Sequence, residues 1–275
     1  MVIFKRIIKN IVMTNCCGDS NSLKNTQKLN HTEAIQQRYG AAALDKETCL
    51  CTPVSFNPKY LDPIPPEVIE KDYGCGDPTK WVKKGDCVLD LGSGSGKNAF
   101  ICAQIVGKNG RVIGIDQNSE MLALSRKSID YVSDQIGYRN TEFIKGSIET
   151  LDELNDDKEP IVKDLSIDII LSNCVLNLVN PDSRKDLLLN IKRVLKNQGR
   201  IAISDIVSNK EVPLSMKNDP DLWSGCISGA WYEPDLIKDF SNLGFKNLKF
   251  AERSVDPWKV INDIEFRTVT LVGNI

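Results

Sequence analysis

The chain has 275 residues, 41% of them hydrophobic and 26% charged, with a formal net charge of −2 at pH 7. This hydrophobic fraction is sufficient for a buried core. No apolar run is long enough to cross a bilayer. Positive and negative residues are mixed along the chain, so no basic surface for nucleic acid or for an anionic membrane is predicted. We therefore expect neither nucleic acid nor a membrane as a partner.

Residues 1–70 show little regular pattern and predict an arm wrapped on the rest of the fold. One helix is expected over residues 32–43, with Thr32 as its cap. Prolines at positions 53, 58, 63, 65 and 66 exclude a long helix until about Glu67. Basic residues interrupt the apolar N-terminus, so no signal peptide is expected, and either Met1 or Met13 can be the start.

Strands and helices alternate from Gly85 onward. Strands are expected at residues 87–91, 111–115, 141–145, 167–171, 200–204, 246–251 and 266–272. Helices are expected at residues 97–106, 118–131, 182–195 and 233–243. Apolar strands separated by helices indicate an α/β fold with a doubly wound, mostly parallel sheet covered on both faces. Ligands of such sheets bind at the carboxyl ends of the strands, beside the first strand.

A glycine-rich segment, Asp90 to Asn98, joins the first of these strands to its helix. Its glycines let the backbone turn sharply and approach a ligand closely. Asp116 ends the next strand, where an acid is placed to bond a pair of ribose hydroxyls. A dinucleotide site has the spacing G-x-G-x-x-G, whereas this segment has G-x-G-x-G after an acid. The carboxylate of Asp90 would repel a pyrophosphate. The pattern therefore predicts a nucleoside cofactor with a cationic or amino group. The alternative interpretation is a tight strand-to-helix turn that binds no ligand.

These features resemble the first motif of the class I S-adenosylmethionine (SAM) methyltransferases. The resemblance implies a Rossmann-like fold, SAM as the cofactor, and these cofactor-binding residues at the strand ends: Asp90, Gly92, Ser93, Gly94, Gly96, Asp116, Ser147, Ile148 and Asn173. In that family the loop after the third strand, here Ser147 and Ile148, packs on the adenine and hydrogen-bonds it. The neighbouring Glu149 either shares this function or is a solvated acid at a helix start.

The chain has nine cysteines, an odd number. A disulfide scaffold is therefore not predicted, and a cytoplasmic location is expected. Cys87 and Cys102 lie in apolar runs and are expected to be inert core residues. The other cysteines lie in polar or glycine-rich segments, where thiolates can react or bind soft ions: Cys16, Cys17, Cys49, Cys51, Cys75, Cys174 and Cys226.

Three cysteines lie in the segments Tyr-Gly-Cys75-Gly, Ser-Asn-Cys174-Val-Leu-Asn-Leu-Val and Gly-Cys226-Ile-Ser-Gly-Ala. Together these blocks resemble the arsenite methyltransferases over about residues 70–245. The resemblance implies that all three cysteines are catalytic and bind As(III), since thiolates are the soft ligands that proteins offer. The arsenic lone pair would attack the SAM methyl group without a general base, in agreement with a single histidine, His31, far from these blocks in sequence.

Under this interpretation residues 1–70 are the arm, 71–207 the SAM-binding core, and 208–275 the C-terminal part of the fold with a substrate-binding loop. In the family an upstream cysteine commonly pairs with the Tyr-Gly-Cys-Gly cysteine during reductive turnover. Cys49 or Cys51 is expected in this redox role, with a thiol reductant such as thioredoxin or glutathione as partner.

Several alternatives remain open. The arsenite enzymes often carry a further C-terminal region, so the substrate can be arsenite, a methylated arsenical or another thiophile. Structural zinc is disfavoured because Cys49-x-Cys51 and Cys16-Cys17 lack the usual two-residue spacing. A methyltransferase acting on carbon, oxygen or nitrogen of a small metabolite would not need the three cysteines. A non-catalytic SAM- or metalloid-binding protein would bind without methyl transfer.

Overall fold

The computed structural model describes residues 31–45, 47 and 54–275. The expected redox cysteines Cys49 and Cys51, the cysteines Cys16 and Cys17, and both possible start residues lie outside these ranges. Along the described ranges no helix combines the length and the apolar character that a membrane span requires.

The centre of the described fold is a nine-stranded sheet. Its strands are β1 (Cys87–Leu91), β2 (Arg111–Asp116), β3 (Thr141–Lys145), β4 (Ile167–Asn173), β5 (Leu195–Ser208), β6 (Trp231–Tyr232), β7 (Lys246–Arg253), β8 (Lys259–Ile261) and β9 (Ile264–Asn274). The order is β3-β2-β1-β4-β5-β9-β7, with β6 paired to β5 and β8 to β9. The strands from β3 to β5 are parallel, whereas β9 is antiparallel to β5 and β7. The predicted doubly wound, mostly parallel sheet is confirmed.

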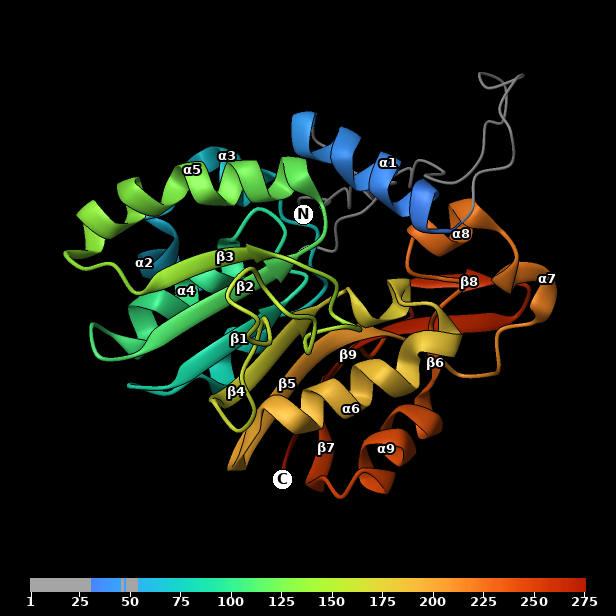
Figure 1. Cartoon of the computed structure of the whole chain (residues 1–275). Coiled ribbons are helices and arrows are strands. Elements are labelled where there is room, and N and C mark those ends of the chain that lie inside the picture. Colours follow the sequence, from blue (N-terminus) through green and yellow to red (C-terminus); the bar gives the residue numbers. More distant parts are fainter. Residues whose placement is uncertain (1–30, 46, 48–53) are drawn as a thin grey trace, which may run out of the picture.

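Helices connect the strands and cover the sheet. The helices are α1 (His31–Leu44), α2 (Pro58–Leu61), α3 (Pro66–Glu70), α4 (Lys97–Val106), α5 (Ser119–Ile136), α6 (Arg184–Val194), α7 (Leu214–Lys217), α8 (Pro220–Ser224) and α9 (Glu233–Asn242). The described residues also form the 3-10 turns η2 (Pro78–Trp81), η3 (Leu176–Leu178) and η4 (Pro181–Ser183). Figure 1 shows α4 and α5 on one side of the sheet and α6 and α9 on the other.

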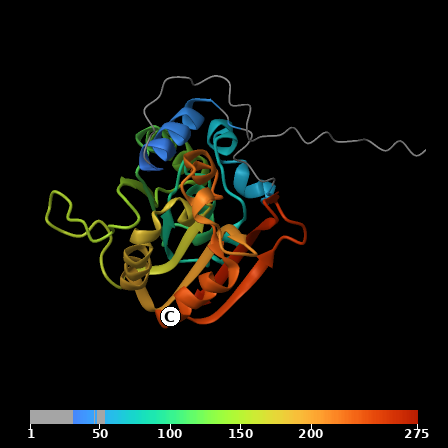
Figure 2. The ribbon, with the colours of Figure 1, turned by 90° about the vertical axis from the view of Figure 1, so that its right-hand side faces the viewer.

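The alternation of side chains along each strand produces a core on both faces of the sheet. Val88 of β1 packs in the cluster that includes α4 and α5. Its neighbour Leu89 packs in the cluster that includes α6 and α9. The arm helix α1 belongs to neither layer: it contacts α5 and α8, and it lies beside α8 both in Figure 1 and in the turned view of Figure 2.

Local chemistry explains where several helices begin and end. The side chain of Asn118 caps α5 by accepting a hydrogen bond from the Met121 N–H at 2.9 Å. Both α2 and α3 begin with a proline at the first helical position, where the missing N–H has no cost. The prolines therefore exclude a long helix, as predicted, but they also start two short helices that were not predicted. Helix α1 begins at His31, so the predicted cap Thr32 lies inside it.

Candidate active site

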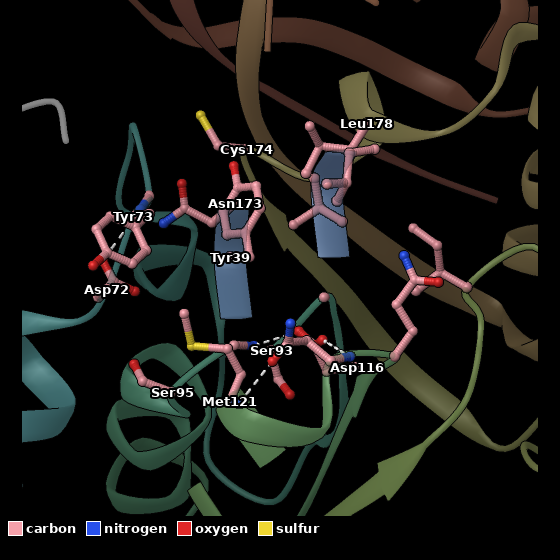
Figure 3. A pocket seen from close by; sticks show the side chains of 18 of the residues that line it. Tyr39, Asp72, Tyr73, Ser93, Ser95, Asp116, Met121, Asn173, Cys174 and Leu178 are labelled. Atoms are coloured by element: carbon pink, nitrogen blue, oxygen red, sulfur yellow. Dashed lines mark hydrogen bonds between the residues drawn. The ribbon is translucent and has the colours of Figure 1, made fainter. Parts of the chain in front are cut away.

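A pocket opens at the carboxyl ends of β1, β2 and β4, on both sides of the point where the strand order reverses (Figure 3). This is the position at which doubly wound sheets bind ligands. Figure 3 shows Ser93, Asp116 and Met121 along one side and Asn173, Cys174 and Leu178 along the other. The predicted site residues that line the pocket are Gly92, Ser93, Gly94, Asp116, Ile148, Asn173 and Cys174.

Asp116 is held at the end of β2 by backbone donors. Its Oδ2 accepts a hydrogen bond from the Gly94 N–H at 2.8 Å, and its Oδ1 accepts one from the Asn118 N–H at 2.8 Å. Burial raises the pKa of this carboxyl, while these N–H groups act to lower it. Because a carboxylate has about four acceptor positions, Asp116 can still accept hydrogen bonds from a ligand.

Two buried polar atoms in the pocket wall lack partners. Ser93 Oγ and Asn98 Oδ1 have no hydrogen-bond partner among the described residues, and both residues line the pocket. Unpaired buried polar atoms are rare in folded proteins because each forfeits its bonds to water. The two atoms therefore indicate a ligand with polar groups. Asn98 was not predicted as a site residue, although it is the last residue of the glycine-rich segment.

Asp90 does not line the pocket. It lies near the end of β1 and is buried, with 1% of its surface exposed. Burial raises the pKa of its carboxyl to about 8, and the nearby carboxylates of Asp72 and Asp116 add to this rise. Its Oδ2 has no hydrogen-bond partner among the described residues. Asp90 thus lies outside the pocket lining, and its predicted contact with a cofactor stays a prediction.

Gly96 and Ser147 also lie outside the pocket lining. Gly96 precedes α4 with a φ of +95°, and a Cβ there would lie 2.8 Å from the Phe143 ring, so this position requires glycine for backbone and packing reasons. The Ser147 hydroxyl donates a hydrogen bond to the Glu149 carboxylate, and Glu149 itself lines the pocket. Both predicted residues support the walls of the site.

The loop that carries Cys75 is fastened to the end of β4 by Asn173. The Asn173 Oδ1 accepts hydrogen bonds from the N–H groups of Cys75 at 2.9 Å and Gly76 at 3.1 Å, and its Nδ2 donates to the Gly76 carbonyl at 2.9 Å. Gly74 has no room for a side chain, because a Cβ would lie 2.2 Å from Asn173 Nδ2. The side chain of Asn173 therefore binds the loop, while the residue also lines the pocket.

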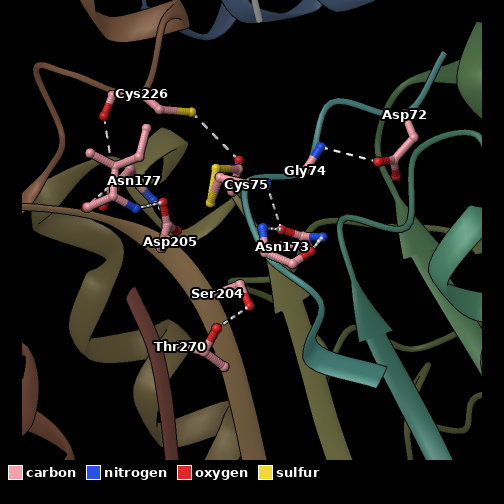
Figure 4. Close-up of a disulfide and its surroundings, with 12 residues drawn as sticks. Asp72, Gly74, Cys75, Asn173, Asn177, Ser204, Asp205, Cys226 and Thr270 are labelled. Atoms are coloured by element: carbon pink, nitrogen blue, oxygen red, sulfur yellow. Dashed lines mark hydrogen bonds between the residues drawn. A yellow bond between two sulfur atoms is a disulfide. The ribbon is translucent and has the colours of Figure 1, made fainter. Parts of the chain in front are cut away.

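Cys75, Cys174 and Cys226 come together in one cluster (Figure 4). A disulfide joins Cys75 to Cys174, with 5.9 Å between their Cα atoms. The thiol of Cys226 donates a hydrogen bond to the Cys174 carbonyl at 3.5 Å. Among the described residues, no group of three His, Cys, Asp or Glu side chains is arranged to hold a metal ion.

The disulfide differs from the expected pairing. Cys75 was expected to pair with Cys49 or Cys51, which lie outside the described residues, and its pairing with Cys174 was not among the alternatives. Cys174 lines the pocket at the strand ends. Cys75 lines a second cavity, beside β7 and β9. The two bonded cysteines thus line different cavities.

The backbone at two of these cysteines is strained. Cys174 has a φ of +60° and Cys226 a φ of +61°, in the left-handed region that residues other than glycine rarely adopt. Such strain persists where the surroundings enforce it, often at functional sites. Burial raises the pKa of the Cys226 thiol to about 12; the nearby Asp205 raises it further, while Tyr39 and Arg38 act to lower it.

The arm contributes to the site in a way that was not predicted. Ile35, Gln36 and Tyr39 of α1 line the pocket together with the strand ends. The sequence did predict the helix, but the position of an arm helix on a core depends on contacts far apart in sequence. The other two free cysteines of the described chain lie elsewhere: Cys102 is buried in α4 and Cys87 is half-buried at the start of β1.

Comparisons with known proteins agree with this architecture. A sequence model of a family described as "Methyltransferase domain" matches residues 82–252. The arsenite methyltransferase of Aquipseudomonas alcaligenes is 34% identical over 227 residues, which are 80% of this chain and 63% of that protein. The arsenite methyltransferase of Rattus norvegicus is 35% identical over 221 residues, 77% of this chain and 58% of that protein. The chain thus spans less than two thirds of the length of these relatives.

A solved structure extends the likeness to three dimensions. The arsenic (III) S-adenosylmethionine methyltransferase of Chlamydomonas reinhardtii superposes with a TM-score of 0.71 at 32% identity, over 80% of this chain and 74% of that chain. The resemblance predicted from the glycine-rich loop and the three cysteine blocks is confirmed. The chain belongs to the methyltransferase-domain family and, within it, to the arsenite methyltransferases.

Proposed function

We propose that this protein is a SAM-dependent methyltransferase that methylates trivalent arsenic held by cysteine thiolates. The observation that carries the proposal is the cluster of Cys75, Cys174 and Cys226 at the edge of the pocket. Cys174 belongs to both the cluster and the pocket wall, so an ion held by these sulfurs would lie next to the pocket. A cluster of this kind has no role in methyl transfer to carbon, oxygen or nitrogen.

The residues of the pocket fit SAM. Asp116 has free acceptor positions for a pair of ribose hydroxyls, and Ser93 Oγ and Asn98 Oδ1 are unpaired in the described chain. Ile148 and Met121 provide apolar surface for an adenine ring. When bound, SAM would supply a methyl group activated by the sulfonium charge. The glycine-rich loop and Asp116 would orient this group toward the end of β4.

The cysteines fit trivalent arsenic once the disulfide is reduced. Two electrons and two protons convert the Cys75–Cys174 bond into two thiols, which together with Cys226 provide three soft ligands. Each thiol must lose its proton to bind the ion. The left-handed backbone at Cys174 and Cys226 sets the direction of two of the three sulfurs before substrate arrives.

A thiol reductant such as thioredoxin or glutathione is the proposed partner. Its thiolate would attack Cys75 Sγ, forming a mixed disulfide and releasing the Cys174 thiolate; a second reductant thiol would then release Cys75 and leave as a disulfide. The cavity lined by Cys75, Thr268 and Thr270 offers an approach that leaves the pocket free. A role of Cys49 or Cys51 in this exchange stays a prediction, as does the cytoplasmic location.

The test is to incubate the reduced protein with arsenite, SAM and glutathione and to separate the arsenic species by liquid chromatography with elemental mass spectrometry. Methylated arsenic is the expected product. Cys174→Ser and Cys226→Ser should each abolish it while SAM binding persists, because a hard hydroxyl does not replace a soft thiolate. Cys87→Ser, at the opposite end of β1 from the pocket, is the matched control and should remain active.

Other outcomes would favour the rival functions. Full activity of a serine variant would remove that cysteine from the set of essential ligands. Binding of arsenite and SAM without any methylated product would favour a binding protein. Methyl transfer to small metabolites that survives both serine changes would favour a methyltransferase for carbon, oxygen or nitrogen.

A further inference from the structure

Helix α1 is fastened to the loop that carries Cys75. The hydroxyl of Tyr73, two residues before this cysteine, donates a hydrogen bond to the Ala42 carbonyl at 2.8 Å and accepts one from the Glu47 N–H at 3.1 Å. Tyr73 is buried, 8% exposed. The C-terminal end of α1 is therefore attached to the start of the Tyr-Gly-Cys-Gly segment.

The same helix is fastened to the segment that carries Cys226. Arg38 Nη1 donates to Ser224 Oγ at 3.0 Å and to the Asp221 carbonyl at 3.4 Å. Its Nε donates to the Glu47 carboxylate at 3.0 and 3.1 Å, and this ion pair orients the guanidinium. Ser224 ends α8 and lies two residues before Cys226, so Arg38 holds the turn from which this thiol projects.

Tyr39 lies between these two attachments. Its ring packs edge-to-face on Tyr73, with 6.2 Å between the centroids, and it lines the pocket (Figure 3). Its hydroxyl oxygen is 3.9 Å from Cys226 Sγ. One residue thus borders the proposed cofactor site and contacts one of the proposed ligand sulfurs.

The direction of these hydrogen bonds suits a thiolate. The Cys226 thiol donates to the Cys174 carbonyl (Figure 4), which leaves the Tyr39 hydroxyl free to donate to the sulfur. When Cys226 binds a soft ion it loses its proton, and with it the bond to this carbonyl. The hydroxyl of Tyr39 can still donate to the charged sulfur, and hydrogen bonds to ionised groups are the stronger ones.

We propose that Tyr39 is a positioning residue for Cys226: its hydroxyl holds the sulfur toward the other two ligands, and Arg38 holds the turn beneath it. This inference rests on the proposed function, because it assumes that Cys226 binds the arsenical. It gives the arm a role in substrate binding.

The test is calorimetric titration of arsenite into the reduced, SAM-free protein. Tyr39→Phe keeps the ring and removes the hydroxyl, so it should weaken arsenite binding by about five- to tenfold. The double variant Tyr39→Phe/Cys226→Ser should bind arsenite no more weakly than Cys226→Ser, because the hydroxyl acts through this sulfur. Tyr138→Phe, whose hydroxyl bonds the Ala103 carbonyl, is the matched control and should bind like the wild type.

Each contrary result has its own meaning. Wild-type arsenite affinity in Tyr39→Phe, or additive losses in the double variant, would overturn the role of Tyr39 and leave the proposed function standing. Wild-type affinity in Cys226→Ser would overturn the ligand assignment and this inference together. Arg38→Met should also weaken arsenite binding while SAM binding persists, and unchanged arsenite affinity there would overturn the role of Arg38.

Discussion

Asp116 is the acid at the end of β2 on which the prediction of a ribose site rests. Its carboxylate accepts hydrogen bonds from the N–H groups of Gly94 and Asn118, and the residue lines the pocket. Asp116→Asn keeps one carbonyl oxygen, so one of these two N–H groups loses its acceptor, and the negative charge is lost as well. It should weaken SAM binding roughly 10- to 100-fold, the range for hydrogen bonds to a charged group. Calorimetry checks this, with the exposed Asp130→Asn on α5 as control; equal affinities in both variants would contradict the ribose assignment.

Asp90 predicts a pH dependence of stability. Its pKa is raised from 3.8 to about 8 in the fold. Between these values the folded protein keeps a proton that the unfolded chain has lost, so this group makes stability fall as pH rises from about 4 to about 8. Asp90→Asn removes this effect and should raise the Tm at pH 8 by at least about 3 °C, with little change near pH 4.5. Scanning calorimetry at both pH values measures it, and a Tm change of equal size at the two values would contradict the assignment.

At the level of elements, the strands could be predicted wherever local apolar runs define them. The expected bounds of β1 and β3 match the structure, because both are short runs closed by polar loops. Strand β5 was expected at residues 200–204 but runs over Leu195–Ser208. It is longer because β4, β9 and β6 all pair with it, and such pairing depends on segments far away in sequence.

The candidate site could be predicted only in part, for the same reason. The motifs located the glycine-rich loop and Asp116, which lie at the ends of β1 and β2, and the three cysteines, whose segments resemble those of the arsenite methyltransferases. They did not predict Tyr39 and Arg38, whose role depends on where α1 packs against α8. They also did not predict that Asn173 binds the loop of Cys75 across 98 residues of sequence, or that Asp90 is absent from the pocket lining.

At the level of the whole molecule, the site is complete only when segments that are far apart in sequence come together in the fold. Cys75 precedes β1, Cys174 follows β4, and Cys226 follows α8. Asn173 at the end of β4 holds the Cys75 loop beside Cys174, and α1 spans from the Cys75 loop to the Cys226 turn. The bond between Cys75 and Cys174 covers a sequence separation of 99 residues, so the redox state of this pair affects the stability of the entire fold.

Reduction of the disulfide should therefore lower the Tm, and arsenite should restore it. Closing a loop of about 100 residues stabilises a fold by roughly 4–5 kcal/mol in the chain-entropy model, which corresponds to a fall of roughly 10 °C on reduction. Arsenite that bridges the reduced sulfurs closes the same loop and binds only the folded state. Scanning calorimetry of oxidised protein, and of protein reduced with a phosphine that contributes no thiol, with and without arsenite, measures both changes. Cys75→Ser cannot form either bridge, so its Tm should not depend on the reductant, and arsenite should raise it far less. A wild-type Tm that is equal in both redox states would show that this bond does not constrain the fold, and equal gains from arsenite in both proteins would remove Cys75 from the arsenic site.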